Sequence, residues 1–287
     1  MSVTGIGLAA LEARIEELHA LPERSDTPRD TARVVNQLLE ALESGEVRSA
    51  VRGADGRWSA VPWVKRGILV GFRFGTLADL SPAGDTFSFV DKDTIPTQRF
   101  GTARNVRIVP GGSTIRRGAY VGPGVVCMPP MFVNVGAHVG AGTMIDSHAL
   151  VGSCAQIGTR CHISAAAQIG GVLEPVNASP VIIEDDVVIG GNCGVYEGTV
   201  VRDKAVLASG VILTRGTPVF DLVHETVLRG SPDAPLEIPA LAVVVPGARA
   251  VKGAWGETQG LSLQTPVIVK YRDERTDLAT SLERWLR

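Results

Sequence analysis

The chain has 287 residues and carries 28 Lys and Arg against 30 Asp and Glu, which gives a net charge of -2. This length is well above the size at which a core needs disulfides or metals to be stable. The balanced charge argues against nucleic acid or an anionic membrane surface as a partner, and no apolar run reaches the ~18 residues of a membrane span. We therefore expect a globular protein that acts on small molecules.

The cysteines predict a reducing environment. They include no Cys-x-x-Cys pair, and acidic residues stand in the N-terminal segment where a signal peptide would need positive ones. Both features favour the cytoplasm. Three cysteines fall in inward-facing positions of the repeat described below, where we expect small buried side chains rather than nucleophiles: Cys127, Cys161 and Cys193.

The first 75 residues predict a helical region. Residues 5–20 place apolar side chains at helical spacing. A second helix is expected to begin at an Asp26 or Thr27 cap, with Pro28 in its first turn, and to end at Gly45. A turn at 54–56 then joins two extended segments, and the pattern that follows over 62–75 fits either a helix or a strand.

A six-residue rhythm organises the middle of the chain. Val, Ile or Leu recurs at every sixth position from Val109 to Ile169 and from Ile183 to Val219, with Cys127 as the one exception. Small residues stand two positions before these steps, so each short strand points one small and one aliphatic side chain inward. Glycine follows many steps, where we expect it to supply the positive φ of a sharp corner.

Three strands and three corners make a coil of eighteen residues, which predicts a parallel β-helix. A β-sandwich is the alternative, but its strands repeat irregularly, every 8 to 12 residues. The rhythm breaks once, because fourteen residues separate Ile169 from Ile183 where two steps would take twelve. We expect an external loop at 171–182, and loops on a rigid scaffold often carry function.

The segments after the repeat predict a smaller C-terminal part. Residues 238–247 resemble one more partial coil, 261–271 read as strands and 277–287 as a terminal helix. We expect an N-terminal helical α+β domain at 1–104, the repeat domain at 105–250, and C-terminal strands and a helix at 251–287.

Longer phrases give the sequence a family resemblance. The segments GTMIDSHALVGSCAQIGTRCHIS and GGVLEPVNASPVIIEDD, together with VRIVPGGSTIRRGAYVGPGVVCMPP, resemble tetrahydrodipicolinate N-succinyltransferase, a family of hexapeptide-repeat acyltransferases, and the likeness extends over nearly the whole chain. The resemblance implies a mainly β fold, a left-handed parallel β-helix with an N-terminal helical cap and a small C-terminal β/α extension. It also implies a homotrimer with active sites between subunits, and succinyl transfer from succinyl-CoA in lysine and diaminopimelate biosynthesis.

Asp146 is the first candidate for a catalytic residue. It stands at the corner just after Ile145, where other coils have glycine, so its carboxylate is expected to project outward. A turn aspartate that bonds its own backbone is the alternative. In the resemblance, Asp146 matches the family's acidic catalytic residue, which implies that it orients the acceptor amine and takes a proton.

The remaining substrate contacts are expected from the resemblance as well. Arg107 matches an arginine that binds a substrate carboxylate; its spacing, two before Val109, puts it in the inward column unless the first coil is open and leaves it exposed. The family often has a second acid at the place of Gly194 and a basic residue at the place of Asn192. Both are missing here, so the second acidic role is either absent or belongs to Glu197.

Coenzyme A is expected as a co-substrate, with no tightly bound cofactor and no metal. The resemblance places four residues along its pantetheine arm and two basic residues near its phosphates: Gly191, Ala208, Ser209, Gly216, Lys270 and Arg272. Among the histidines, His148 is the expected helper because it lies two residues from Asp146, whereas His138 and His162 are expected to point outward.

Three other functions remain open from the sequence. Acetyl-CoA could replace succinyl-CoA as the donor, because the extra carboxylate needs only one well-placed cation or amide. A zinc enzyme of the hexapeptide carbonic anhydrase kind is less favoured, since its His-x-x-x-x-His spacing does not occur. A solenoid that only binds, without catalysis, is the third.

Overall fold

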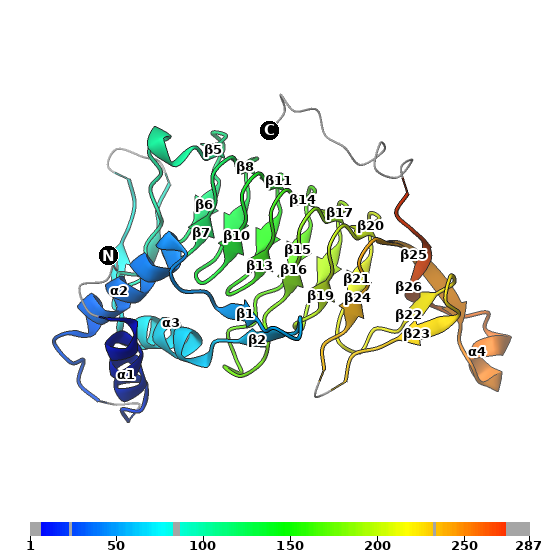
Figure 1. Ribbon diagram of the computed structural model, residues 1–287, viewed down its shortest axis with the longest axis horizontal. Coiled ribbons are helices and arrows are strands. Elements are labelled where there is room, and N and C mark those ends of the chain that lie inside the picture. The colour runs from blue at the N-terminus through cyan, green and yellow to red at the C-terminus, as the bar shows by residue number, and fades with distance from the viewer. Residues whose placement is uncertain (1–6, 23–24, 83–86, 232–233, 274–287) are drawn as a thin grey trace.

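The computed structural model describes residues 7–22, 25–82, 87–231 and 234–273. Figure 1 shows a stack of short strands between three helices at one end and a sheet of longer strands at the other. No helix in these ranges is long and apolar enough to cross a membrane. The terminal helix expected at 277–287 lies outside the described residues.

Three helices form the N-terminal part: α1 (Leu8–His19), α2 (Thr31–Ser44) and α3 (Pro62–Phe74). They share a core because each presents apolar residues at helical spacing, such as Leu11, Leu38 and Ile68, all fully buried. The segment 62–75, which the sequence left open, is therefore a helix, with Pro62 in its first turn.

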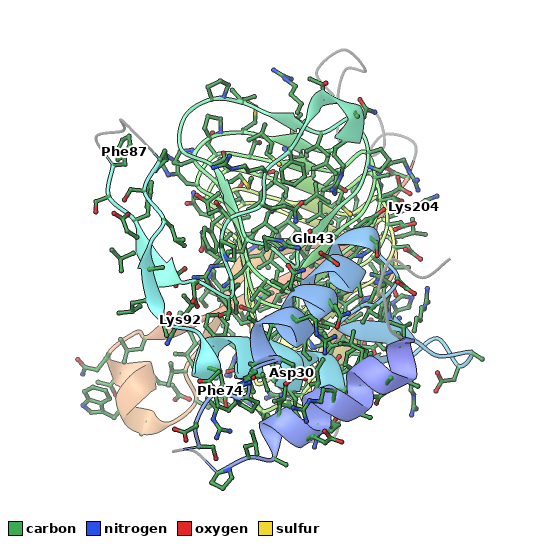
Figure 2. The ribbon with its side chains drawn as sticks, turned by 90° about the vertical axis from the view of Figure 1, so that its left-hand side faces the viewer. Asp30, Glu43, Phe74, Phe87, Lys92 and Lys204 are labelled. Carbon is green, nitrogen blue, oxygen red and sulfur yellow. The ribbon has the colours of Figure 1, made fainter. Side chains whose placement is uncertain are left out.

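The second helix starts later than expected. Its N-cap is Asp30, not Asp26 or Thr27, because Pro28 closes a separate turn by accepting a hydrogen bond from the Thr31 amide. Its end is as predicted, since Gly45 adopts the left-handed conformation at φ 78°. Figure 2 shows Glu43 near this end of α2, and its carboxylate accepts hydrogen bonds from Arg117 and the Gly118 amide in the first coil.

Two small sheets accompany the helices. The hairpin of β1 (Ala50–Arg52) and β2 (Trp58–Ala60) has its turn where the sequence predicts it. A second pair, β3 (Leu77–Asp79) and β4 (Val90–Lys92), follows α3, and a 3-10 turn, η1 (Thr102–Arg104), leads into the repeat.

The repeat forms a three-sided parallel β-helix. Most paired strands are parallel and eighteen residues apart, as Met144 and His162 are. The step is longer at the external loop, at the first strand of the β5 face and at the last coil. The aliphatic and small columns are buried inside the prism, as the sequence predicts; Ile145, Ile157 and Ala155 are fully buried. We name its three faces by their first strands.

The β7 face consists of β7 (Tyr120–Val121), β10 (His138–Val139), β13 (Gln156–Ile157), β16 (Ile182–Ile183), β19 (Val200–Val201) and β24 (Glu237–Ile238). The β6 face consists of β6 (Thr114–Ile115), β9 (Phe132–Val133), β12 (Leu150–Val151), β15 (Gln168–Ile169), β18 (Gly194–Val195) and β21 (Ile212–Leu213).

The β5 face is the longest. It consists of β5 (Arg107–Ile108), β8 (Val126–Cys127), β11 (Met144–Ile145), β14 (His162–Ile163), β17 (Val188–Ile189) and β20 (Val206–Leu207), continued by β25 (Ala242–Ala250), β26 (Ser262–Tyr271), β22 (Val219–Asp221) and β23 (Thr226–Leu228). A short helix, α4 (Ala254–Thr258), connects β25 to β26. The segment from 238 thus joins the prism, as expected.

Three corners separate the faces. The leading corner precedes the β5-face strands, the trailing corner follows them, and the loop corner lies opposite that face. The trailing corner contains residues 128–130, 146–148, 164–166, 190–192 and 208–210. The external loop leaves the prism at the loop corner, between β15 and β16.

The expected role of the corner glycines was wrong. Gly140 and Gly152, which follow inward aliphatic residues, do not have positive φ; it occurs two residues later, at Gly142 and Cys154. A Cβ on Gly140 would instead lie 2.4 Å from the Gly158 carbonyl oxygen. These glycines are needed because the next coil stacks too closely for a side chain.

The first coil is out of register with the expected rhythm. Ile108, not Val109, is paired with Cys127, so Ile108 takes the inward step and Arg107 points outward, where it is exposed. The segment 110–113, with two glycines at positive φ, contains the extra residue before Ile115. The expectation that Arg107 lies in the inward column is therefore wrong. Arg107 is exposed because of this register shift and not because the first coil is open, since β5 and β6 both pair with the next coil.

Candidate active site

Asp146 projects from the trailing corner, immediately after β11. Its Oδ2 lies 2.9 Å from Nε2 of His162, and the two side chains are 29% and 18% exposed. The contact forms because His162 lies one coil beyond Met144 and pairs with it, and Met144 is two residues before Asp146. Oδ1 of Asp146 makes no side-chain hydrogen bond within the described part of the chain, so this oxygen is open to a ligand.

The expected helper histidine was the wrong one. His148 has φ 62° and is exposed, and its ring has no described contact with Asp146. His162 does point outward, as the sequence predicts, and this brings it to the carboxylate. Adding one coil of eighteen residues to Met144 gives His162, so the contact could have been anticipated from stacking rather than from sequence proximity.

The outward positions of the β5 face form one continuous row. The pairing runs from Arg107 through Met144 and His162 to Val206, then through Val243 to Lys270. Arg107 is three strands from His162 in this row, or about 14 Å at ordinary strand spacing. The fold thus places Arg107, the Asp146–His162 pair and Lys270 along one side of the prism.

The six residues expected to contact coenzyme A do not gather in one chain. Gly191, Ala208 and Ser209 lie together at the trailing corner, where a Cβ on Gly190 would be 2.5 Å from the Ser209 amide nitrogen. Nζ of Lys270 donates a hydrogen bond to Asp273. Arg272 extends to the leading corner, where it donates to the backbone carbonyls of Asp186 and Lys204.

Gly216 and Glu197 lie at the loop corner, across the prism from the β5 face. Glu197 has φ 53°, and its Oε2 accepts a hydrogen bond from the Arg215 amide at 3.1 Å. Glu197 lines an open cavity of about 680 Å³ together with Tyr196 and with Glu174 of the external loop. Within one chain, Glu197 therefore belongs to a different surface from Asp146.

The structure also shows what replaces the missing second acid. A Cβ on Gly194 would lie 2.4 Å from Cε2 of Tyr196 and 2.9 Å from its hydroxyl. The ring of Tyr196 therefore covers the outward side of Gly194, and an acidic side chain at this position would clash with it. Asn192, at φ 57°, is a corner residue of the trailing edge.

The cysteines are not candidates for a nucleophile. All four are unpaired and buried. Burial raises the pKa of Cys127 and of Cys161 to about 12, so neither thiol ionises near neutral pH. Within the described ranges, no three His, Cys, Asp or Glu side chains are grouped so that they could hold a metal ion.

Comparisons with known proteins agree over nearly the whole chain. The family model "Tetrahydrodipicolinate N-succinyltransferase N-terminal" matches residues 10–74, and the model "Hexapeptide repeat of succinyl-transferase" matches residues 180–215. The 2,3,4,5-tetrahydropyridine-2,6-dicarboxylate N-succinyltransferase of Bradyrhizobium diazoefficiens is 42% identical over 98% of this chain and 100% of its own length. That of Paramagnetospirillum magneticum is 41% identical over the same shares.

One solved structure covers most of the chain. A putative 2,3,4,5-tetrahydropyridine-2-carboxylate N-succinyltransferase from Campylobacter jejuni covers 82% of this chain and 62% of its own, at 16% identity and a TM-score of 0.45.

Proposed function

Because the chain belongs to the 2,3,4,5-tetrahydropyridine-2,6-dicarboxylate N-succinyltransferase family, we propose that it transfers succinyl from succinyl-CoA to the amino group of ring-opened tetrahydrodipicolinate, 2-amino-6-oxopimelate. This is a step of lysine and diaminopimelate biosynthesis. The family resemblance drawn from the sequence, and the left-handed β-helix that it implied, are confirmed.

The observation that carries the proposed chemistry is the Asp146–His162 pair. An amine must be unprotonated and aimed at the thioester carbonyl before it can attack. His162 holds one carboxylate oxygen of Asp146 at 2.9 Å. The other oxygen accepts a proton from the substrate amine as the nitrogen attacks.

The acyl transfer then proceeds directly between the two substrates. The nitrogen–carbon bond forms, the carbon–sulfur bond breaks, and the coenzyme A sulfur leaves with the electron pair. The thiolate takes up the proton that Asp146 removed, so one amide and one thiol replace one amine and one thioester. Arg107, exposed in the same row as His162, would bind a substrate carboxylate through its planar fork.

Coenzyme A is proposed to lie along the trailing corner. Gly191 follows Asp146 there by two coils and Ala208 and Ser209 by three, and small residues let a thin chain approach the backbone. Lys270 lies at the end of the outward row of the β5 face, where it could bind a phosphate of coenzyme A. Gly216 and Arg272 lie at the other two corners, so they would contact the cofactor only from a second subunit.

A homotrimer is proposed for the same reason. Glu197, Glu174 and the external loop lie across the prism from Asp146, so a site that uses both regions requires two neighbouring chains. The outward row of the β6 face, which includes the partly buried Phe132 and Leu150 and the exposed Ile212, would supply contact area. We also propose a cytoplasmic location, because the four cysteines are unpaired.

Turnover of the purified protein with succinyl-CoA and acetyl-CoA side by side tests the donor. The proposal predicts amide formation with succinyl-CoA at a much higher kcat/KM. Equal or faster reaction with acetyl-CoA would favour the acetyltransferase alternative, and failure to bind coenzyme A in calorimetry would favour a scaffold.

A further inference from the structure

A second pocket lies away from the proposed active site, between the N-terminal hairpin and the β7 face. Trp58 of β2 packs on Ile182 and Val200 of this face, and the hairpin lies beneath β16 and β19 in Figure 1. The hairpin, the preceding Arg48 and the leading corner enclose a cavity of about 220 Å³. The whole β5 face separates the leading corner from Asp146.

The cavity contains an arginine with few partners. Nε of Arg48 donates to Oε1 of Gln156 at 3.0 Å, and its guanidinium lies 5.5 Å from the Trp58 ring centre. Among the described residues, no carboxylate forms an ion pair with Arg48. Burial lowers the pKa of this guanidinium, although the charge of Asp185 acts in the opposite direction from across the cavity.

Two residues of the cavity lining each have a buried polar atom that lacks a partner. Nδ1 of His138 and Oγ1 of Thr159 are buried and make no hydrogen bond. The His138 ring stacks on Tyr120, with centres 4.3 Å apart. Burial, with Arg48 nearby, lowers the pKa of His138 to about 3, so the imidazole is neutral at physiological pH and can donate from one nitrogen. Buried polar groups without partners are costly, which points to a ligand.

The acidic residues of the cavity are already bonded. Glu184 is 4% exposed and accepts hydrogen bonds from the Trp58 indole at 2.8 Å, from Arg202 at 2.9 Å and from the Asp203 amide. Asp185 accepts from the Thr159 amide, and Asp203 accepts from the Asp185 amide. The donors without a carboxylate partner or without any partner are Arg48, His138 and Thr159, and the second oxygens of Asp185 and Asp203 make no hydrogen bond to the described residues.

We propose that this cavity binds a small carboxylate, with its oxygens on the Arg48 fork and on the Nδ1 of His138 and the hydroxyl of Thr159. A water molecule occupies about 30 Å³ in the liquid, so the cavity admits a molecule of several heavy atoms, such as a short dicarboxylate or an amino acid. Its amino group, if present, would face Asp185 at the half-exposed rim. Such a ligand would tie the N-terminal part to the β-helix, because Arg48 belongs to one and His138 to the other.

Calorimetric titration of the intact protein, with coenzyme A present, tests the proposal. Succinate and L-glutamate serve as carboxylate probes with and without an amino group, and 1,5-diaminopentane is the cationic control. We expect carboxylate binding that depends on the cavity residues, and a ligand-dependent rise in Tm. Tighter binding of L-glutamate or of succinate identifies the subclass, and either result supports the site.

Two variants remove the proposed contacts. Arg48→Met and His138→Phe are expected to weaken carboxylate binding at least tenfold, and the phenyl ring keeps the stacking on Tyr120. Arg57→Met, which changes an exposed arginine of the same hairpin, is the matched control and should bind as the wild type does. Turnover with succinyl-CoA verifies that each variant is folded and separates this site from the catalytic one.

Three results would overturn the proposal: no carboxylate binding to the wild type, unchanged binding in both cavity variants, or preferential binding of the diamine. If Arg48→Met fails to fold, His138→Phe alone decides, because it removes a donor and leaves the arginine in place.

Discussion

The Asp146 carboxylate lies 2.9 Å from the His162 imidazole although the two residues belong to successive coils and are separated by 16 positions. Without the other, each of the two side chains would be held less firmly, because Asp146 stands at a corner and His162 lies on the outer surface of the β5 face. The β-helix register brings them together, since Met144 pairs with His162.

Replacing His162 should reduce turnover without unfolding the protein. His162→Leu removes the group that holds Asp146, and a hydrogen bond to a charged group contributes about 1.5–3 kcal/mol. We expect kcat to fall about ten- to a hundredfold, with the KM for succinyl-CoA nearly unchanged. His162→Gln, which can donate to the same oxygen, should recover part of the rate; no recovery combined with a lower Tm would indicate a purely structural role.

The corner glycines should be intolerant of any side chain. Gly140→Ala would place a Cβ 2.4 Å from a backbone oxygen of the next coil. We expect the free energy of unfolding to fall by about 1–3 kcal/mol. Gly216→Ala is the matched control, because its Cβ would meet nothing within 4 Å. Urea unfolding of both variants is the measurement, and equal stabilities would show that stacking is looser than the structure indicates.

The C-terminal sheet should lose stability in acid through Asp221. This carboxylate accepts hydrogen bonds from Nδ1 of His224 at 2.8 Å and from the Tyr271 hydroxyl at 2.7 Å. Burial alone would raise the pKa of Asp221, but these bonds outweigh it and lower the pKa from 3.8 to about 2. A lowered folded-state pKa stabilises the protein above pH 3.8, and this contribution is lost as the pH falls toward 2.

Asp221→Asn measures this contribution. At pH 7 the variant should be less stable than the wild type by about 2 kcal/mol, and the difference should shrink between pH 4 and pH 2. Unfolding in urea at several pH values gives the difference directly. A gap that stays constant over this range would show that the ionised form of Asp221 is not what the contacts stabilise.

Lys65 should hold the external loop in place. Its side chain is fully buried, and Nζ donates to the Ala178 carbonyl at 2.5 Å. Burial lowers the pKa of this amine. Lys65→Met should speed proteolysis within 171–180 and reduce turnover, because the loop lines the cavity beside Glu197. Lys252→Met, at an exposed position, is the control; equal cleavage in the two variants would argue against the tether.

Much of the fold follows from the repeat alone. The six-residue period predicts which side chains enter the prism, and it correctly places Asp146 at an outward corner. The one-residue register shift at Arg107 was not predictable from the period. It is caused by one additional residue in 110–113, and only the pairing of Ile108 with Cys127 shows it.

The site was harder to predict because its contacts cross coils or domains. His162 meets Asp146 only through stacking, and Arg48 meets Gln156 across 108 residues, where no local pattern applies. Positive φ was the wrong reason for the glycines that follow the inward aliphatic residues. Close stacking of the coils also favours glycine, and the sequence pattern does not distinguish the two causes. The sequence also gave no sign that Tyr196 covers Gly194, because the ring reaches back over its own strand.

The central claim is that Asp146 receives the proton of the attacking amine. The direct measurement is steady-state turnover of Asp146→Asn with succinyl-CoA and the ring-opened acceptor, with coenzyme A affinity and Tm measured on the same preparation. We predict an unchanged fold and unchanged affinity, and a kcat reduced by about 10²–10⁴-fold, the usual contribution of a general base. A rate close to that of the wild type would contradict the account.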